Sequence, residues 1–248
     1  MRPAPRELTE LDLPGCGHLA VLAPHPDDFD AIAVTMRHFA RRGWRIRLAV
    51  LTSGASGVED GYRGARSIAD KTALREAEQR SSCHVFGLPP DDLHFLRLDG
   101  AGGDAFAVDS ASLARVRAFL RTAQPTRVFM PHGDDANLAH RRTWELFRTI
   151  AREDGLAVEA WLNRDAKTRA MREDVFARFG AEEAAWKAGL LRLHASQHAR
   201  NLATRGHGFD ERVLAVNRAS ADAAGWSGEW AEAFEVVRFG TGGDGMRL

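Results

Sequence analysis

Short apolar runs alternate with segments of helical periodicity along the first two thirds of the chain. The run at residues 18–23 ends at a proline and predicts a buried strand. Apolar side chains then recur at helical spacing over 32–40, and Gly43 ends that segment. The same pattern predicts strands at 46–51, 93–98, 127–130 and 156–162 and helices at 69–86, 109–122 and 139–152. Strands that alternate with helices of this length are typical of parallel βαβ units, so the fold class is α/β: a doubly wound, mostly parallel, Rossmann-like sheet with helices on both faces.

The alternation loosens beyond Asn163. Two or three helices are expected there, over about 181–193, 198–204 and 209–223, and a strand near 234–239 follows them. No internal repeat is visible, so we expect one domain over residues 1–248 with a helical C-terminal part. The residues from Gly240 are expected to form a mobile tail. The glycine-rich stretch 100–103 lacks the helix start that a dinucleotide-binding loop needs, and it predicts a flexible loop.

The composition is that of an ordinary globular protein, with 248 residues of which 44% are hydrophobic and 27% charged. The 34 Lys and Arg residues balance the 34 Asp and Glu residues, and no basic block stands out. Neither nucleic acid nor an anionic membrane is therefore expected as a partner. Two cysteines exclude a disulfide framework and favour a cytoplasmic location. Residues 1–14 lack the apolar segment of a signal peptide, and no apolar run approaches the roughly 18–20 residues that span a bilayer.

Three loops that carry polar and ionisable residues follow predicted strands. They are residues 24–30, 52–66 and 131–140. In an open α/β sheet, ligands bind outside the carboxyl ends of the strands. We therefore expect the side chains of these loops to converge at one edge of the sheet.

The segment Pro-His-Pro-Asp-Asp at residues 24–28 places an imidazole and two carboxylates at the end of the first predicted strand. Pro26 restricts His25 to extended geometry and so holds it in a defined relation to Asp28. This N/O ligand pair suits a divalent metal. His140 starts a later helix and would complete a site of two histidines and one carboxylate, which leaves positions open for water and substrate. The alternative is an ordinary helix N-terminus capped by Asp27 or Asp28.

Six motifs in order resemble those of the PIG-L/LmbE-like family of metal-dependent N-deacetylases. The resemblance covers residues 18–239, which we take as the core of the domain. The matching segments are Ala-Pro-His-Pro-Asp-Asp at 23–28, Leu-Thr-Ser-Gly at 51–54, Arg-Glu at 75–76, the segment Asp-Ala-Asn-Leu-Ala-His at 135–140, His-Ala-Ser-Gln at 194–197 and Trp-Ala-Glu-Ala-Phe at 230–234. Each motif is weak alone, and their order and spacing make the resemblance specific.

The resemblance implies an enzyme that removes an acyl group, by hydrolysis of an amide, from an amino sugar or a similar small polar substrate. By the same resemblance His25, Asp28 and His140 are the ligands of one divalent metal per chain, zinc by default, and Asp27 is the general base. The expected partner is a small molecule, an N-acylated amino sugar. The sequence leaves the oligomeric state, and a homo-oligomer in particular, open.

The chain departs from the family pattern at three positions. Phe29 replaces the Glu that usually follows the Asp pair, and Ala139 replaces an Asp that is a candidate partner of the metal ligands. Asn137 replaces a His, and an amide can donate a hydrogen bond but cannot supply a proton. We therefore expect His194 to act as the general acid, with protonated Asp27 acting alone as the alternative. These changes leave the three ligands and the base intact.

Other polar and aromatic side chains have two interpretations each. Arg75, Asn137 and His132 are expected to bind substrate, although Arg75 could equally form a surface ion pair with Glu78 three residues on. His132 is also a second candidate for the acid. The loop 52–66 either covers the site or is an ordinary solvated loop. We expect core packing for Trp226 and Trp230, rather than a wall that stacks on a sugar, and a buried helical position for Cys83.

Two other functions compete with hydrolysis. Two histidines and one carboxylate also suit a non-haem iron oxygenase, but those enzymes usually have β-rich barrels. The departures at positions 137 and 139 would also fit a catalytically weak relative that binds a metal or a ligand. The presence of Asp27 argues against this, because a binding protein needs no base beside the metal.

Overall fold

The computed structural model describes residues 5–99 and 106–240, and within them eight strands form one mixed sheet. The order across the sheet is β1-β7-β8-β6-β5-β2-β3-β4. The bounds of the strands are Arg6–Glu7 (β1), His18–Ala23 (β2), Arg45–Val50 (β3), Leu93–Phe95 (β4), Arg127–Pro131 (β5), Val158–Asn163 (β6), Val175–Phe179 (β7) and Trp230–Phe239 (β8). Neighbouring strands from β6 to β4 are parallel, whereas β8 is antiparallel to both β6 and β7.

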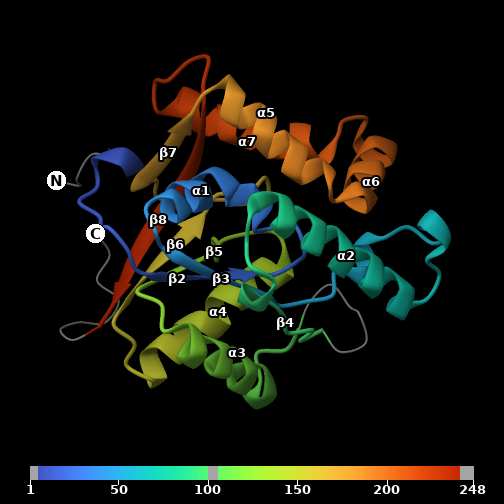
Figure 1. Cartoon of the computed structure of the whole chain (residues 1–248), viewed down its shortest axis with the longest axis horizontal. Helices are drawn as coiled ribbons and strands as arrows, with labels where there is room; N and C mark the ends of the chain where they lie inside the picture. Colours follow the sequence, from blue (N-terminus) through green and yellow to red (C-terminus); the bar gives the residue numbers. More distant parts are fainter. Residues whose placement is uncertain (1–4, 100–105, 241–248) are drawn as a thin grey trace.

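Helices cover both faces of the sheet (Figure 1). One layer contains α1 (Ala33–Arg41), α2 (Ile68–Phe86), α5 (Ala181–Arg192) and α7 (Phe209–Ala223). The other contains α3 (Ser110–Ala123) and α4 (Leu138–Glu153), and α6 (Ala195–Arg205) lies beyond the end of α5. Short 3-10 turns occupy Leu8–Glu10, Asp30–Ile32, Ala55–Gly57, Tyr62–Gly64 and Pro90–Asp92.

The apolar run of β2 is continuous because the helical layers bury both faces of the strand. Leu19, Val21 and Ala23 pack into the core beneath α1 and α2. Ala20 and Leu22 pack into the opposite core, beneath α3 and α4. All five side chains are buried, as expected for a central strand of a parallel sheet.

The predicted elements and the fold class are confirmed, and two strands were missed. The short strands β1 and β7 were not predicted, and β8 begins at Trp230, earlier than the predicted 234–239. Among the described strands, β7 pairs with β1 and β8, which are far away in the sequence. The predictions for the glycine stretch 100–103 and for the tail after Gly240 lie outside the described residues.

The course of the chain places a crevice between β2 and β5. From β2 the sheet extends through β3 to β4 in one direction, whereas β5 and β6 extend it in the other. Loops that follow strands on either side of such a switch point diverge and leave a crevice at the carboxyl ends. The loops after β2 and β5 are those that carry the candidate metal ligands.

Candidate metal centre

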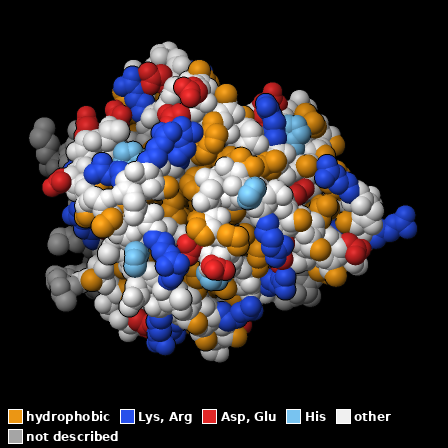
Figure 2. Space-filling model, in the orientation of Figure 1, with side chains coloured by type: hydrophobic (Ala, Val, Ile, Leu, Met, Phe, Trp, Pro, Cys, Tyr) orange, Lys and Arg blue, Asp and Glu red, His pale blue; other side chains and the backbone are white. Residues whose placement is uncertain are grey.

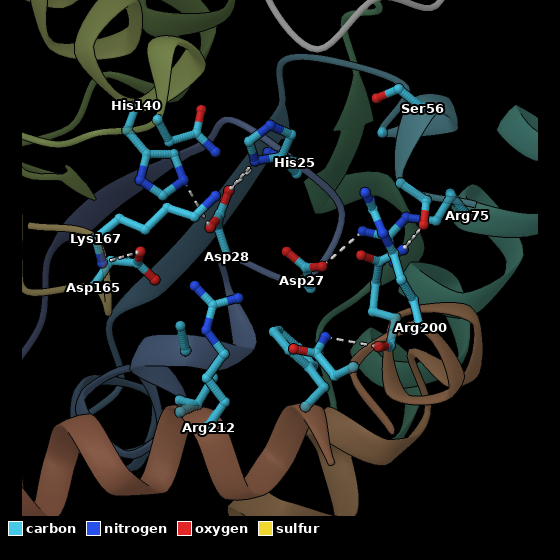
Figure 3. A pocket seen from close by; sticks show the side chains of 18 of the residues that line it. His25, Asp27, Asp28, Ser56, Arg75, His140, Asp165, Lys167, Arg200 and Arg212 are labelled. Carbon is cyan, nitrogen blue, oxygen red and sulfur yellow. Dashed lines mark hydrogen bonds and ion pairs between the residues drawn. The ribbon is translucent and has the colours of Figure 1, made fainter. Parts of the chain in front are cut away.

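A cavity of about 420 Å³ lies at the carboxyl ends of β2 and β5 (Figure 3). All three predicted loops contribute to it, through residues that include His25, Gly54 and Asn137. The segment after β6 and the helices α6 and α7 complete the wall. The size is that of a site for a small molecule.

His25 and Asp28 lie on the tight turn that follows β2. The loop after β3 holds this turn, because the backbone N–H and the hydroxyl of Thr52 both donate to the Pro24 carbonyl, at 3.0 and 2.8 Å. The carboxylate of Asp28 accepts the backbone N–H of His25 at 2.8 Å and lies 3.1 Å from its Nδ1. The three-residue spacing thus brings imidazole and carboxylate together, as the restriction by Pro26 predicts.

His140 reaches the same carboxylate from the first turn of α4. Its Nε2 lies 3.5 Å from Asp28 Oδ1. Asn137 begins the helix as its N-cap, and its side-chain oxygen accepts the N–H of Ala139 at 2.9 Å. On the other side of the ring, His140 Nδ1 lies 3.4 Å from the buried carboxylate of Asp135. A carboxylate behind a ligating histidine fixes the orientation of the ring and is typical of metal sites.

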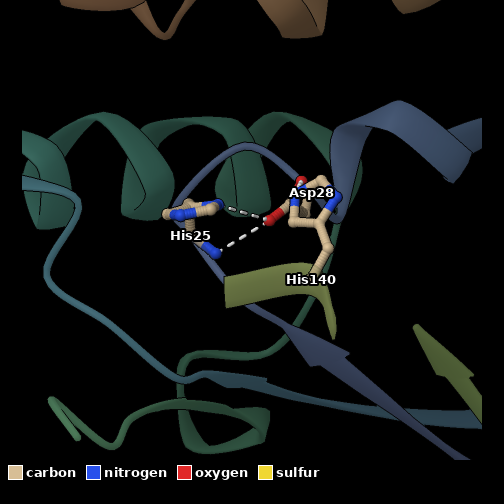
Figure 4. Close-up of side chains that lie close together, drawn as sticks. All are labelled: His25, Asp28 and His140. Carbon is tan, nitrogen blue, oxygen red and sulfur yellow. Dashed lines mark hydrogen bonds and ion pairs between the residues drawn. The ribbon is translucent and has the colours of Figure 1, made fainter. Parts of the chain in front are cut away.

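The donor atoms of His25, Asp28 and His140 fit a divalent cation. They lie within 4.8 Å of one another, with Asp28 between the two imidazoles (Figure 4). Burial acts to lower the pKa of His140, but Asp28, Asp135 and Asp165 outweigh burial and raise that pKa to about 10. The position therefore favours positive charge, which a divalent metal would supply in place of a proton. Two nitrogens and one oxygen are a common ligand set for catalytic zinc.

Asp27 lies beside this cluster, and its carboxylate is turned to α2. Its backbone has a φ of 127°, a value that L-residues rarely adopt, and its N–H donates to Gln79 at 3.0 Å. One carboxylate oxygen lies 2.7 Å from a guanidinium nitrogen of Arg75. Burial raises the pKa of Asp27, and Arg75 opposes that effect. Asp27 thus lies next to the candidate metal ligands without taking part in their cluster.

Arg75 is buried and not the surface residue that the alternative interpretation described. It pairs with Glu78 at 3.3 Å, as that interpretation expected, and also donates to the Pro26 carbonyl. Glu78 in turn accepts the N–H and the hydroxyl of Ser196 from α6, each at 2.7 Å. These contacts tie the turn after β2 to α2 and α6. Arg75 lines the cavity. One terminal nitrogen of its guanidinium contacts Asp27 and the Pro26 carbonyl, the other contacts Glu78, and the buried Nε has no hydrogen-bond partner among the described residues.

Gly54 makes this arrangement sterically feasible. It has a φ of +64°, and a Cβ added there would lie 2.9 Å from Pro26 and 3.2 Å from Arg75. Only glycine therefore fits here without a shift of the turn that carries the ligands. The close approach of Gly54 to Pro26 and Arg75 explains why the Leu-Thr-Ser-Gly motif ends in glycine.

Two predicted site residues do not line the cavity. His194 is wholly buried, and its Nε2 lies 2.6 Å from Asp30 Oδ2. His194 is the N-cap of α6, and its imidazole is turned into the interior, so the geometry does not support the predicted role of a general acid. His132 lies 3.4 Å from Glu235 and is likewise absent from the cavity wall, so the prediction that it binds substrate is not supported. Asn137 lines the cavity, and its role in binding substrate stays a prediction.

Sequence reasoning missed the far wall of the cavity. Its charged members follow β6 or belong to α6 and α7: Asp165, Lys167, Arg200, Arg205 and Arg212. Asp165 could have been found, because it follows a predicted strand whose carboxyl end lies at the same edge of the sheet. The three arginines gave no such signal, because charged residues on the outer helices of an α/β fold are ordinary.

The remaining predictions concern packing. Trp226 packs edge-on against Phe176, and Trp230 stacks on Phe179, so neither forms part of the cavity. Cys83 is buried in α2, as predicted, and Cys16 is exposed. Within the described residues, none of the helices combines the length and the apolar character that crossing a membrane requires.

Solved structures share this fold at low sequence identity. N,N'-diacetylchitobiose deacetylase from Pyrococcus horikoshii superposes with a TM-score of 0.72 at 16% identity, over 88% of this chain and 82% of that one. A zinc-inhibited form of teicoplanin deacetylase Orf2 gives 0.64 at 15%, over 89% and 98%. GalB, the 4-carboxy-2-hydroxymuconate hydratase from Pseudomonas putida KT2440, gives 0.65 at 17%, over 93% and 98%. At these identities the likeness establishes the fold.

Comparison with families of known sequence gives a more specific result. No protein of curated function matches the chain. The sequence pattern of PIG-L, described as GlcNAc-PI de-N-acetylase, matches residues 20–151, which is more than half of the chain and includes all three candidate metal ligands. The chain therefore belongs to the PIG-L family of de-N-acetylases, which are hydrolytic enzymes.

Proposed function

We propose that this protein hydrolyses the N-acyl amide of an amino sugar, with the help of one divalent metal. The observation that carries the proposal is the position of Asp27, a carboxylate held by Arg75 next to a cluster of two histidines and one carboxylate in an open cavity. The family supports the amide, and the diacetylchitobiose deacetylase of the same fold supports the sugar.

In this proposal, His25, Asp28 and His140 hold the metal. A divalent metal in such a site lowers the pKa of a bound water from near 16 to about 7 and polarises a carbonyl group. Asp135 keeps the imidazole of His140 in its orientation from behind. The turn after β2 keeps His25 and Asp28 together, since Asp28 accepts the N–H of His25.

Asp27 would act as the general base that takes a proton from the attacking water. With His194 buried against Asp30, Asp27 is also the group that returns the proton to the leaving amine. Arg75 keeps the Asp27 carboxylate in place through both transfers. The side-chain amide of Asn137, which lines the cavity, is the candidate donor to the carbonyl oxygen of the substrate.

Zinc is the metal that the ligand set favours. The oxygenase alternative with iron fits less well, because the sheet is an open α/β sheet and not a barrel. The structure of teicoplanin deacetylase Orf2 is described as a zinc-inhibited form, so the effect of excess zinc on activity must be measured separately. Activity should therefore be compared after chelation and restoration with one equivalent and with an excess of zinc, cobalt or iron.

The test is acetate release from a panel of N-acetylated amino sugars. We expect activity that a chelator removes and that one equivalent of metal restores. Asp27→Asn should lower kcat by about 10²–10⁴-fold, since Asn keeps the shape but cannot accept the proton, while metal content stays unchanged. Near-normal turnover by Asp27→Asn would refute the role of this residue. Ligand binding without any turnover would favour the binding protein over the enzyme.

A second candidate function is the hydration of an unsaturated, carboxylated substrate. It is favoured by Asn137, which stands where the family pattern has a proton-donating histidine, and by the arginines on the cavity wall. GalB, described as a hydratase, shares the fold over 93% of this chain. Loss of ultraviolet absorbance from unsaturated dicarboxylates, without acetate release from any amide, would favour this candidate.

A further inference from the structure

The wall of the cavity opposite the metal centre is cationic. Arg212 extends from α7 toward Asp28, and Lys167 approaches the same centre from the segment after β6 (Figure 3). Arg205, at the C-terminal end of α6, lines the cavity as well. These side chains come from separate elements, so their meeting is a product of the fold and not of a local charge run.

These three cations have no carboxylate partner. Within residues 5–99 and 106–240, no carboxylate oxygen lies within 4.0 Å of the charged nitrogens of Lys167, Arg205 or Arg212. Arginines just outside the cavity wall or at its rim do have such partners. Arg192 pairs with Asp210 at 2.7 Å, and Arg200 pairs with Glu59 at 3.4 Å. Arg205 donates to the side-chain oxygen of Asn201 at 3.1 Å, a neutral partner that leaves its charge uncompensated. The charges of Lys167, Arg205 and Arg212 therefore remain available for an anionic ligand.

The excess of positive charge is local. The cavity lining contains five Lys and Arg residues and three carboxylates, whereas the whole chain has equal numbers of both kinds. Arg75 and Arg200 pair with Glu78 and Glu59 just outside the lining, so the excess rests on Lys167, Arg205 and Arg212. A bound divalent metal would add to this excess. Burial, together with Arg212 and Arg200, lowers the pKa of Arg205, so the like charges are close enough to repel one another. An anion among them would relieve that repulsion.

The face of the molecule in Figure 2 does not suggest a polyanion as ligand. In the view of Figure 2, Lys and Arg side chains alternate with Asp and Glu side chains and form no continuous basic track. A nucleic acid would need such a track along its phosphates. The observations therefore favour a small ligand that carries its negative charge into the cavity.

We propose that the substrate carries an oxyanion group, a phosphate or a carboxylate, which Arg212 binds together with Arg205 and Lys167 while the amide lies at the metal centre. The proposal rests on the proposed amide hydrolysis and names its substrate class: an N-acylated sugar phosphate or sugar acid. Guanidinium groups suit both anions, because their paired N–H donors match two oxygens. The same contact would orient the amide relative to Asp27.

Calorimetric titration with glucose 6-phosphate, glucuronate and glucose tests this binding without an amide to hydrolyse. At least one anionic sugar should bind roughly tenfold or more tightly than glucose, and added salt should weaken it. Arg212→Gln should weaken that binding by roughly 10- to 100-fold and leave glucose unaffected. Arg205→Gln serves as a second variant. Arg115→Gln, an exposed arginine of α3 outside the cavity lining, is the matched control and should bind like the unaltered protein.

The outcomes separate this proposal from the proposed function. Preference for glucose 6-phosphate indicates a sugar phosphate, and preference for glucuronate indicates a sugar acid. Equal binding of all three probes, or equal losses in Arg212→Gln and Arg115→Gln, would overturn the anion site. Because the probes contain no amide, anion binding that persists without any acetate release would overturn the hydrolysis and not the anion site.

Discussion

The backbone of Asp27 is strained, with a positive φ that is unfavourable for a residue other than glycine. Its φ of 127° costs on the order of 1–3 kcal/mol, which the surroundings must offset. The offset comes from the hydrogen bond to Gln79 and the ion pair with Arg75, both on α2. Such strain clusters at active sites. The arrangement keeps one carboxylate beside the candidate metal ligands and turned away from their cluster.

Asp135 is not one of the three proposed metal ligands, so its effect on metal binding can be tested while they stay unchanged. Its carboxylate is wholly buried, lies 3.4 Å from His140 Nδ1 and accepts the N–H of Asn137 at 2.6 Å. We expect Asp135→Asn to weaken metal affinity by about 10- to 100-fold, because the ring of His140 loses its anionic partner. Competition with a chromophoric chelator measures this affinity.

Asp134→Asn is the matched control, since Asp134 is the exposed neighbour of Asp135. It should bind metal like the unaltered protein. Equal affinity of both variants would show that Asp135 does not support the centre.

Contacts between side chains that are close together in the sequence could be predicted from the sequence. His25 and Asp28 are three residues apart on one turn, so their contact follows from local geometry. The burial of His194 could not be predicted, because a motif does not reveal which way a side chain faces, and this one faces Asp30 in the interior. Arg212 could not be found because its place in the cavity depends on the packing of α7 against the rest of the fold.

At the scale of elements, Glu232 joins four of them. This buried residue of β8 accepts the N–H groups of Val34 and Thr35, at the start of α1, at 3.1 and 2.8 Å. It also pairs with Lys187 of α5 at 2.7 Å, and Lys187 donates to Asn217 of α7 at 2.8 Å. Burial lowers the pKa of Lys187, and Glu232 opposes that effect. The family motif around Glu232 thus has a structural basis.

We expect Glu232→Gln to destabilise the protein by about 3–5 kcal/mol, because it leaves the buried charge of Lys187 uncompensated. Urea unfolding followed by circular dichroism measures this. The double variant Lys187→Met/Glu232→Gln should recover part of the loss. Glu229→Gln, in the exposed pair with Arg178, should not shift the midpoint measurably. If Glu232→Gln were as stable as the unaltered protein, the account of this cluster would be wrong.

Regular elements of the parallel half of the sheet were predictable. At the other edge β8 was predicted with too late a start, and β1 and β7 were missed. β2 is a continuous apolar run because both faces are buried, so its pattern is strong. β7 has five residues, and β1 has two. Segments this short carry little periodicity, and their pairing is decided by partners distant in sequence.

For the molecule as a whole, the crevice at the switch point explains why residues from both ends of the chain meet. The loops after β2 and β5 bring the candidate metal ligands, and the helices α6 and α7 bring the cationic wall. The first part of this arrangement follows from the rule for open α/β sheets. The second depends on helices that follow the matched family region of residues 20–151, where this chain can differ in substrate from its relatives.

The central claim is that one divalent metal binds through His25, Asp28 and His140, and elemental analysis of purified variants tests it most directly. The unaltered protein should contain about one equivalent of metal after dialysis. His140→Ala should lose nearly all of it, because two ligands from one turn remain. His132→Ala is the matched control, since His132 lies in the same loop but pairs with Glu235 outside the cavity, and it should retain the metal. Full metal content in His140→Ala, or an equal loss in both variants, would contradict the account.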